Sequence, residues 1–287
     1  VIHGDGNLGV EGDGFSVLFS RPEGSIVSLR YDGREWIAVP PAPTYWRATT
    51  DNDKGNGFGL ESCAWLAADQ FRGYRSSQMT VTEEEDAVTV SFVYEVPVVP
   101  AARTEVSYTV TSDGRIHVSA QYFGKMGLPQ LPLFGMRLRL YPWANRFTYY
   151  GRGPEENYCD RACGARLGIF SGTPEGNLSR YLVPQECGGR TDVRWLTVSD
   201  ADGNGLQFAC CDKPFAINVL PFTAEELENA AHREELPWPP RYTVVSILGA
   251  HRGVGGDDSW GAPVHPEYCV SGETNQKVEF VIRKARK

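Results

Sequence analysis

The sequence predicts an all-β protein in which two large antiparallel sheets face each other. Apolar and polar residues alternate over long stretches of the chain, as in strands that bury one face. The 31 glycines and 19 prolines supply many turns, and hydrophobic residues make up 41% of the 287 positions, enough for a large core. No repeat, linker or change of composition divides the sequence, so we expect residues 1–287 to form one domain.

The clearest strands are expected over 87–96, 106–110 and 116–122, where every second residue is apolar. The run Ser112-Asp113-Gly114 between the last two predicts the turn of a hairpin. The same alternation predicts further strands over 15–19, 26–30, 136–141, 193–198, 206–210, 242–248 and 277–283.

Two short helices are expected to interrupt the sheets. Thr223 is followed three residues later by Glu226, which is the spacing of a capping box, and then by the apolar Leu227. Pro237 and the prolines after it are expected to end this helix. A weaker helical pattern covers residues 60–70.

Composition excludes several classes of function. The formal net charge is −8 and no basic stripe is visible, so nucleic acid is not an expected partner. No stretch approaches the roughly 20 apolar residues of a membrane span. The sequence shows no secretory signal pattern, and its seven cysteines include no CxxC pair, which together favour a cytoplasmic protein with free thiols.

Four segments, 45–53, 150–161, 183–190 and 253–260, break the alternation and are rich in polar and aromatic residues. In the second segment, four charged residues could brace a turn through charge-assisted hydrogen bonds, namely Arg152, Glu156, Asp160 and Arg161. Asn157 suits the turn itself, and Tyr158 suits a buried ring with a bonded hydroxyl.

The first segment suggests a similar brace. Arg47, Asp51 and Asp53 lie close together in the sequence. The run Asp51-Asn52-Asp53 is rich in oxygen ligands, but it lacks the glycine and the distal glutamate of an EF-hand loop. We therefore expect no metal site in this chain.

These segments carry a resemblance to a known family. The runs are Arg47-Ala48 leading into Asp51-Asn52-Asp53, Gly151-x-Gly153-Pro154-x-Glu156-Asn157-Tyr158, and Gly255-Gly256-Asp257-Asp258-Ser259-Trp260. In order and spacing they resemble the C-terminal domain, or small chain, of the β-galactosidases of glycoside hydrolase family 2. The resemblance covers nearly the whole chain. Glu155 and Cys159 depart from it, because the best-known relatives carry Gln and Pro there.

The resemblance implies a fold for this chain and assigns catalysis to a different domain of the enzyme. The fold is the antiparallel supersandwich shared with galactose mutarotases. The parent enzyme would hydrolyse terminal β-D-galactosides with retention, using two glutamates on an upstream barrel. This chain would have no catalytic residue and no cofactor of its own, while the other domains would use Mg²⁺ and Na⁺. Its expected partners are that barrel or large chain, the galactoside, and further copies in a homo-oligomer.

Trp260 is the sugar-binding residue that the resemblance implies. The tryptophan at the end of this run reaches across to the barrel in the family and offers an apolar wall to the sugar. Gly253, Gly255 and Gly256 would allow the tight backbone turn that presents the ring. Asp257 and Asp258 would hold the loop by bonding backbone N–H groups or an arginine. Without the resemblance, a core position for Trp260 would be expected.

Two other functions remain open at this stage. An aldose mutarotase needs an acid and a base beside the anomeric carbon, and His251 with Glu156 could supply them. A carbohydrate-binding module needs exposed aromatic platforms, for which the chain offers Trp46, Trp143, Trp195 and Trp238. Hydrolysis by this chain alone is not expected, because adjacent carboxylates such as those of Glu155 and Glu156 point to opposite faces of a strand.

Overall fold

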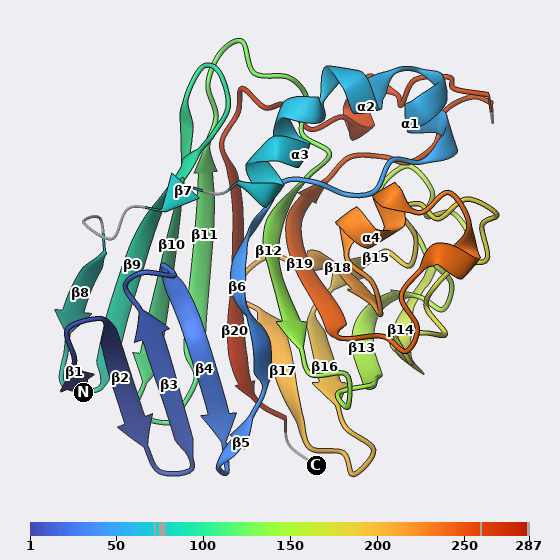
Figure 1. The fold of residues 1–287 in the computed structure, drawn as a ribbon. Helices are drawn as coiled ribbons and strands as arrows, with labels where there is room; N and C mark the ends of the chain where they lie inside the picture. Colours follow the sequence, from blue (N-terminus) through green and yellow to red (C-terminus); the bar gives the residue numbers. More distant parts are fainter. Residues whose placement is uncertain (72, 75–78, 259, 286–287) are drawn as a thin grey trace.

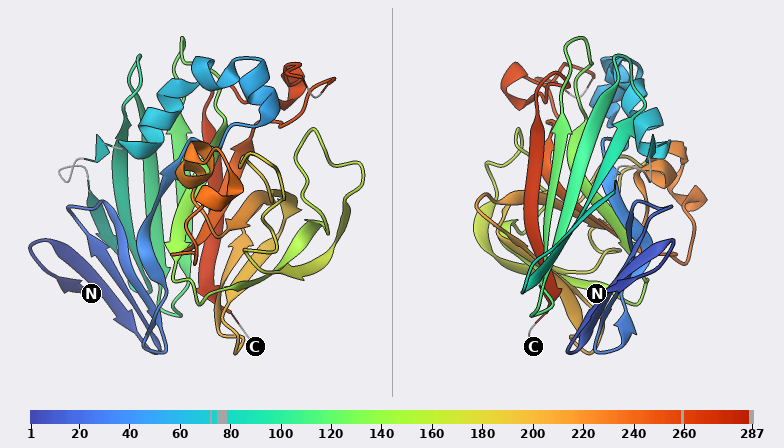
Figure 2. Two further views of the ribbon diagram at one scale, coloured as in Figure 1. Left: turned by 45° about the vertical axis from the view of Figure 1, so that its right-hand side comes forward. Right: turned by 90° about the vertical axis from the view of Figure 1, so that its left-hand side faces the viewer.

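The computed structural model describes residues 1–71, 73–74, 79–258 and 260–285. Its strands form two facing layers (Figures 1 and 2). In the described part of the chain, one layer is a ten-stranded sheet and the other consists of two five-stranded sheets. These two meet where β4 (Ser25–Tyr31) packs beside β6 (Ile37–Thr44). The predicted all-β antiparallel class is therefore confirmed, with one of the two layers divided.

The ten-stranded sheet is built around long hairpins. Its order is β14-β13-β16-β17-β20-β11-β10-β9-β7, with β8 pairing β9 at the same edge. Its strands are β7 (Gly73–Tyr74), β8 (Thr80–Glu83), β9 (Ala87–Val96), β10 (Ala102–Thr111), β11 (Ile116–Phe123), β13 (Arg146–Gly153), β14 (Arg166–Gly172), β16 (Trp195–Ser199), β17 (Gly205–Cys210) and β20 (Gln276–Lys284). The predicted turn lies between β10 and β11, where Gly114 has a φ of 78° that favours glycine.

The facing layer contains the chain's N-terminal strands and the strands that adjoin three of the four polar segments, whereas segment 150–161 begins in β13 of the ten-stranded sheet. The N-terminal sheet has the order β1-β2-β3-β4-β5, and the other has the order β15-β18-β19-β12-β6. Besides β4 and β6, these strands are β1 (Ile2–His3), β2 (Asn7–Gly12), β3 (Phe15–Ser20), β5 (Arg34–Glu35), β12 (Leu133–Leu140), β15 (Arg190–Val193), β18 (Phe215–Leu220) and β19 (Thr243–His251). Strand β6 contains three prolines, which are tolerated because it lies at a sheet edge.

The core fills the space between the layers. Alternate residues of β9 and β10 point inward, and Val90, Phe92, Val106 and Tyr108 are almost completely buried. Their aromatic rings pack against Phe19 from the N-terminal sheet. The sequence alternation therefore marks the inner face of these strands, as expected for half-buried sheets.

The expected strand at 193–198 was wrong in one respect. Val193 ends β15 in one layer, whereas Trp195 begins β16 in the other. The chain crosses between layers at Arg194, just after Asp192, whose φ of 55° redirects the backbone. Within 193–198 the buried residues are Val193, Leu196 and Val198, so the burial changes phase at the crossover.

Short helices lie outside the sheets, most of them at one end of the sandwich (Figure 1). In the described residues they are α1 (Asp51–Gly55), α2 (Phe58–Glu61), α3 (Cys63–Gln70) and α4 (Ala224–Asn229), with 3₁₀ turns η2 (Arg233–Glu235) and η3 (Pro266–Tyr268). The predicted capping box of Thr223 and Glu226 begins α4, which ends at Asn229, well before the prolines. The expected helix at 60–70 is divided at Ser62. None of the described helices combines the length and apolar character needed to cross a membrane.

Helix α1 was not predicted. Thr50 begins it through a second capping box, in which its hydroxyl accepts from the backbone N–H of Asp53 and the Asp53 carboxylate accepts from the backbone N–H of Thr50. Aspartate at the third position is a weaker sequence signal than the glutamate that identified α4. The polar run was therefore interpreted as an extended brace rather than as a helix.

Candidate functional site

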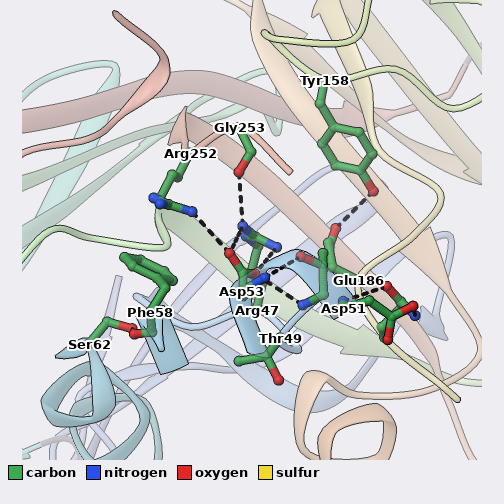
Figure 3. A network of polar contacts seen from close by, with 12 residues as sticks. Arg47, Thr49, Asp51, Asp53, Phe58, Ser62, Tyr158, Glu186, Arg252 and Gly253 are labelled. Carbon is green, nitrogen blue, oxygen red and sulfur yellow. Dashed lines mark hydrogen bonds and ion pairs between the residues drawn. The ribbon is translucent and has the colours of Figure 1, made fainter. Parts of the chain in front are cut away.

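The four polar segments meet on one side of the sandwich, where side chains of each segment bond to another. Arg47 bonds the carbonyl of Gly253, and Gly255 donates its backbone N–H to Asp160 at 2.8 Å. The exposed Asp51 exchanges two hydrogen bonds with Gln185, each of 3.1 Å. Residues separated by up to 206 positions are thus held in one network (Figure 3).

A buried cluster of three charged residues lies at the centre of this network. The Arg47 guanidinium is 2.9 Å from Asp53, and Arg252 donates to the same carboxylate at 3.0 Å. Arg47 is 1% exposed and Asp53 is 1% exposed, so water screens these charges little. The Arg252 guanidinium also stacks on the Phe58 ring at 3.7 Å. One carboxylate therefore compensates two buried cations and joins α1 to the segment after β19 (Figure 3).

Helix α1 also contacts the loop that carries Trp260. Asn52 donates its side-chain amide to the carbonyl of Asp258 at 2.9 Å. A Cβ added to Gly55 would lie 2.5 Å from the carbonyl oxygen of Trp260 and 2.8 Å from the Cα of Gly261. The two backbones are therefore in direct contact, and only glycine allows this approach.

Asp258 holds the same loop from within. Its carboxylate accepts the backbone N–H groups of Trp260 and Ala262 at 2.9 and 3.0 Å, and these bonds lower the pKa of Asp258. Within the described residues, Asp257 instead pairs with His265 at 2.7 Å rather than with an arginine or a backbone N–H. The Trp260 side chain is 85% exposed, so the core position that its residue type alone would suggest is wrong. Ser259, from the same run, lies outside the described residues.

Glu156 is the centre of a second group of contacts. Its carboxylate accepts from Arg161 at 2.6 Å, Ser179 at 2.9 Å, Tyr181 at 2.8 Å and the backbone N–H of Gly188 at 2.7 Å. Desolvation by burial raises the pKa of Glu156, but these four donors outweigh it and the pKa lies below its ordinary value. The pairing with Arg161 was expected, whereas the two hydroxyls come from a segment that the sequence did not single out.

Replacing Glu156 with Gln should lower the free energy of unfolding by about 2 kcal/mol at about pH 7, because hydrogen bonds to a charged group are lost. The folded pKa lies below the ordinary value of 4.5, so this stabilisation is present above that value and disappears as the pH falls through the folded pKa. Denaturant unfolding of the wild type and of Glu156→Gln should show that the difference between their free energies of unfolding becomes smaller as the pH is lowered. The exposed neighbour Glu155 provides the control variant Glu155→Gln. A free-energy difference between the wild type and Glu156→Gln that does not change with pH would contradict the role given to the Glu156 charge.

The remaining braces of the second segment differ from the expected turn. Asn157 uses both ends of its amide, donating to the carbonyls of Arg152 and Glu155 and accepting from Thr191. Arg152 pairs with Asp192 rather than with a residue of its own segment. Asp160 was expected near Arg161 but bonds Gly255.

Three residues of this region were not identified from the sequence. Arg252 adjoins the glycine-rich run, and Gln185 and Glu186 lie in the third polar segment. Glu186 accepts from Tyr158 at 3.3 Å and lies 3.7 Å from His251, so the proposed pairing of His251 with Glu156 is replaced by one with Glu186. Trp46 is 2% exposed and cannot be a sugar platform. The described residues contain no group of three or more His, Cys, Asp or Glu arranged to hold a metal ion.

Comparison with known proteins places this geometry in a family. The family model described as β-galactosidase small chain matches residues 11–282. The chain belongs to this family. It is 46% identical to a β-galactosidase of Halalkalibacterium halodurans over 98% of its own length but only 28% of that protein. It is 42% identical to a β-galactosidase small subunit of Latilactobacillus sakei, with 98% of this chain and 96% of that subunit covered.

Solved structures support the fold assignment of this small-chain domain. A galactose mutarotase-like protein from Lactobacillus casei aligns over 98% of the chain with a TM-score of 0.51 and 10% identity. A protein described as an aldose 1-epimerase from Escherichia coli K12 aligns over the same share with a TM-score of 0.50 and 13% identity. At such low sequence identity, the structural similarity is evidence for a shared fold only. It confirms the predicted galactose mutarotase-like sandwich.

Proposed function

We propose that this small-chain domain completes the galactoside site of a partner barrel and that Trp260 forms an aromatic wall of that site. The observation that carries the proposal is an indole that is 85% exposed on a loop whose backbone is fixed. Asn52 and Asp258 bond this loop, and Gly55 packs against it. A large apolar ring held outward in this way costs little entropy on binding and suits a surface that is covered in an assembly.

A sugar ring gives the indole a suitable counterpart. One face of galactose carries C–H groups, and a broad flat ring matches that face. Leu60 of α2, the helix that follows α1, is also exposed, at 82%. On this proposal, the partner barrel or large chain covers these side chains, and the galactoside lies between the two parts. Further copies of the whole assembly would form the homo-oligomer.

Two carboxylates of the polar segments bond groups of this chain's own loops, which supports assigning hydrolysis to the partner. A retaining glycosidase needs two carboxyl groups about 5–5.5 Å apart on either side of one sugar bond. Glu156 accepts four donors, and Asp258 accepts two backbone N–H groups. We infer that the catalytic pair belongs to the barrel and that Mg²⁺ and Na⁺, where the enzyme uses them, bind its other domains.

Complementation tests the proposal directly. The small-chain domain and the barrel-containing large chain are produced separately and together, and hydrolysis of a chromogenic β-galactoside is measured. We expect no hydrolysis from this chain alone and strong hydrolysis from the mixture, since each part holds only a portion of the site. A mixture of the large chain with an unrelated β-sandwich protein is the control. Hydrolysis by the isolated chain at the rate of the mixture would overturn the proposal.

A further inference from the structure

A side-chain hydrogen bond from α1 joins the loop that carries Trp260 to the rest of the domain. Within the loop, the Asp258 carboxylate accepts the backbone N–H groups of Trp260 and Ala262, so these bonds tie the loop only to itself. The Asn52 amide of α1 donates to the Asp258 carbonyl at 2.9 Å. Among the described residues, no other side chain outside residues 258–262 bonds to this part of the loop. Asn52 is therefore the polar link between this loop and α1.

Buried charges hold Asn52 in place from the inner side of α1. Asp53, the next residue, is 1% exposed and pairs with both Arg47 and Arg252. The backbone of α1 is therefore attached to the buried cluster one residue away from the Asn52 amide. A carbonyl can only accept, so the amide nitrogen of Asn52 has to face Asp258. The donor is thus oriented within this chain before a partner or a sugar binds.

We propose that Asn52 is a positioning residue, which holds the Trp260 ring in the place where it meets the galactoside. The inference rests on the proposed function, because it takes Trp260 as a wall of the sugar site. Asn52 does not touch the sugar and acts only through Asp258 and the loop backbone. Without this bond the loop is more mobile, and the binding of the sugar has to order it at an entropic cost. Loss of the bond should therefore raise KM and leave kcat unchanged.

Asn52→Asp tests this role, because it keeps the shape of the side chain but replaces the donor with an acceptor. A negative charge in the first turn of a helix is favourable, so α1 should stay folded. After complementation with the large chain, KM for a chromogenic β-galactoside should rise about twofold to tenfold, the range that one hydrogen bond contributes. Asn52→Ala removes the donor without adding a charge and should give the same rise. Asn145→Asp, the same change at an exposed position between β12 and β13, should leave KM and kcat at their wild-type values.

A double-mutant cycle distinguishes positioning from a general loss of stability. If Asn52 acts through the indole, Asn52→Asp should raise KM in the wild-type background but should change it no further once Trp260 is replaced with Ala. If the two substitutions instead multiplied their effects on KM, Asn52 would not act through Trp260 and the proposal would be overturned. A loss confined to kcat in Asn52→Asp would overturn it as well, since a displaced wall weakens binding.

Nuclear magnetic resonance of the isolated chain, labelled with ¹⁵N-tryptophan, gives a readout that does not depend on activity. The chain has seven tryptophans, and Trp260→Phe assigns the backbone amide signal of Trp260. Asn52→Asp should lower the heteronuclear NOE of this amide, which reports faster local motion, and leave the other six unchanged. An unchanged NOE at Trp260 would overturn the proposal.

The kinetic results also separate this inference from the proposed function. A wild-type KM in Trp260→Ala would contradict the aromatic wall, and the positioning of a sugar-binding ring with it. A raised KM in Trp260→Ala beside a wild-type KM in Asn52→Asp would overturn the role of Asn52 alone.

Discussion

Asp53→Asn should lower the free energy of unfolding of this domain by about 3–5 kcal/mol, the usual cost of breaking a buried ion pair on one side. The substitution keeps the shape of the side chain but removes the only charge that Asp53 offers to Arg47 and Arg252. Both guanidinium groups stay buried, at 1% and 3% exposure. Two cations would then lie close together in a region that water hardly reaches, and this repulsion gives the substitution its large effect.

Denaturant unfolding measures the effect, and the same helix provides a matched control. Asp51 is exposed and bonds a neutral glutamine, so Asp51→Asn should change the free energy by less than about 1 kcal/mol. A second variant, Asp53→Glu, keeps the charge but lengthens the side chain and should fall between the two. If Asp53→Asn and Asp51→Asn proved equally mild, the buried cluster would not be what holds α1 in place.

The sheets of this protein could be predicted from local sequence because their signal is local. In β9 the alternation of Val88, Val90 and Phe92 reports directly which face is buried. The capping box at Thr223 is equally local, since four residues specify the start of α4. Such features depend on the geometry of one strand or one helical turn, which a short stretch of sequence determines.

The partners within the site could not be predicted, because they come from distant parts of the chain. Arg252 meets Asp53 across 199 positions, and Glu186 meets Asn218 across 32. Nothing in the residues beside Arg252 indicates that a carboxylate from α1 will reach it. The crossing of layers at Arg194 is hidden for a similar reason, since an apolar residue such as Val193 or Leu196 does not record which sheet will bury it.

Trp260→Ala should reduce kcat/KM for β-galactoside hydrolysis by the assembled enzyme about tenfold to a hundredfold, or roughly 1.4–2.8 kcal/mol. The substitution removes the ring that we propose contacts the C–H face of the sugar. Because the side chain is 85% exposed in this chain, its loss should leave the free energy of unfolding of the isolated domain unchanged. The assay is hydrolysis of a chromogenic galactoside after complementation, with the melting temperature of the variant measured in parallel.

Trp238→Ala is the matched control. Trp238 is also exposed, at 72%, but it lies after η2 and is not part of the loop that carries Trp260. Equal losses from both variants would show that exposed aromatic surface in general matters for assembly, and the aromatic-wall role would be lost. Trp260→Phe separates the remaining explanations. If the indole packs on the sugar, the smaller flat ring of phenylalanine should restore part of the kcat/KM that the alanine variant loses. If the indole only docks on the barrel, the Trp260 variants should need a higher concentration of this chain for complementation, but the assembled enzyme should have the kinetics of the wild type.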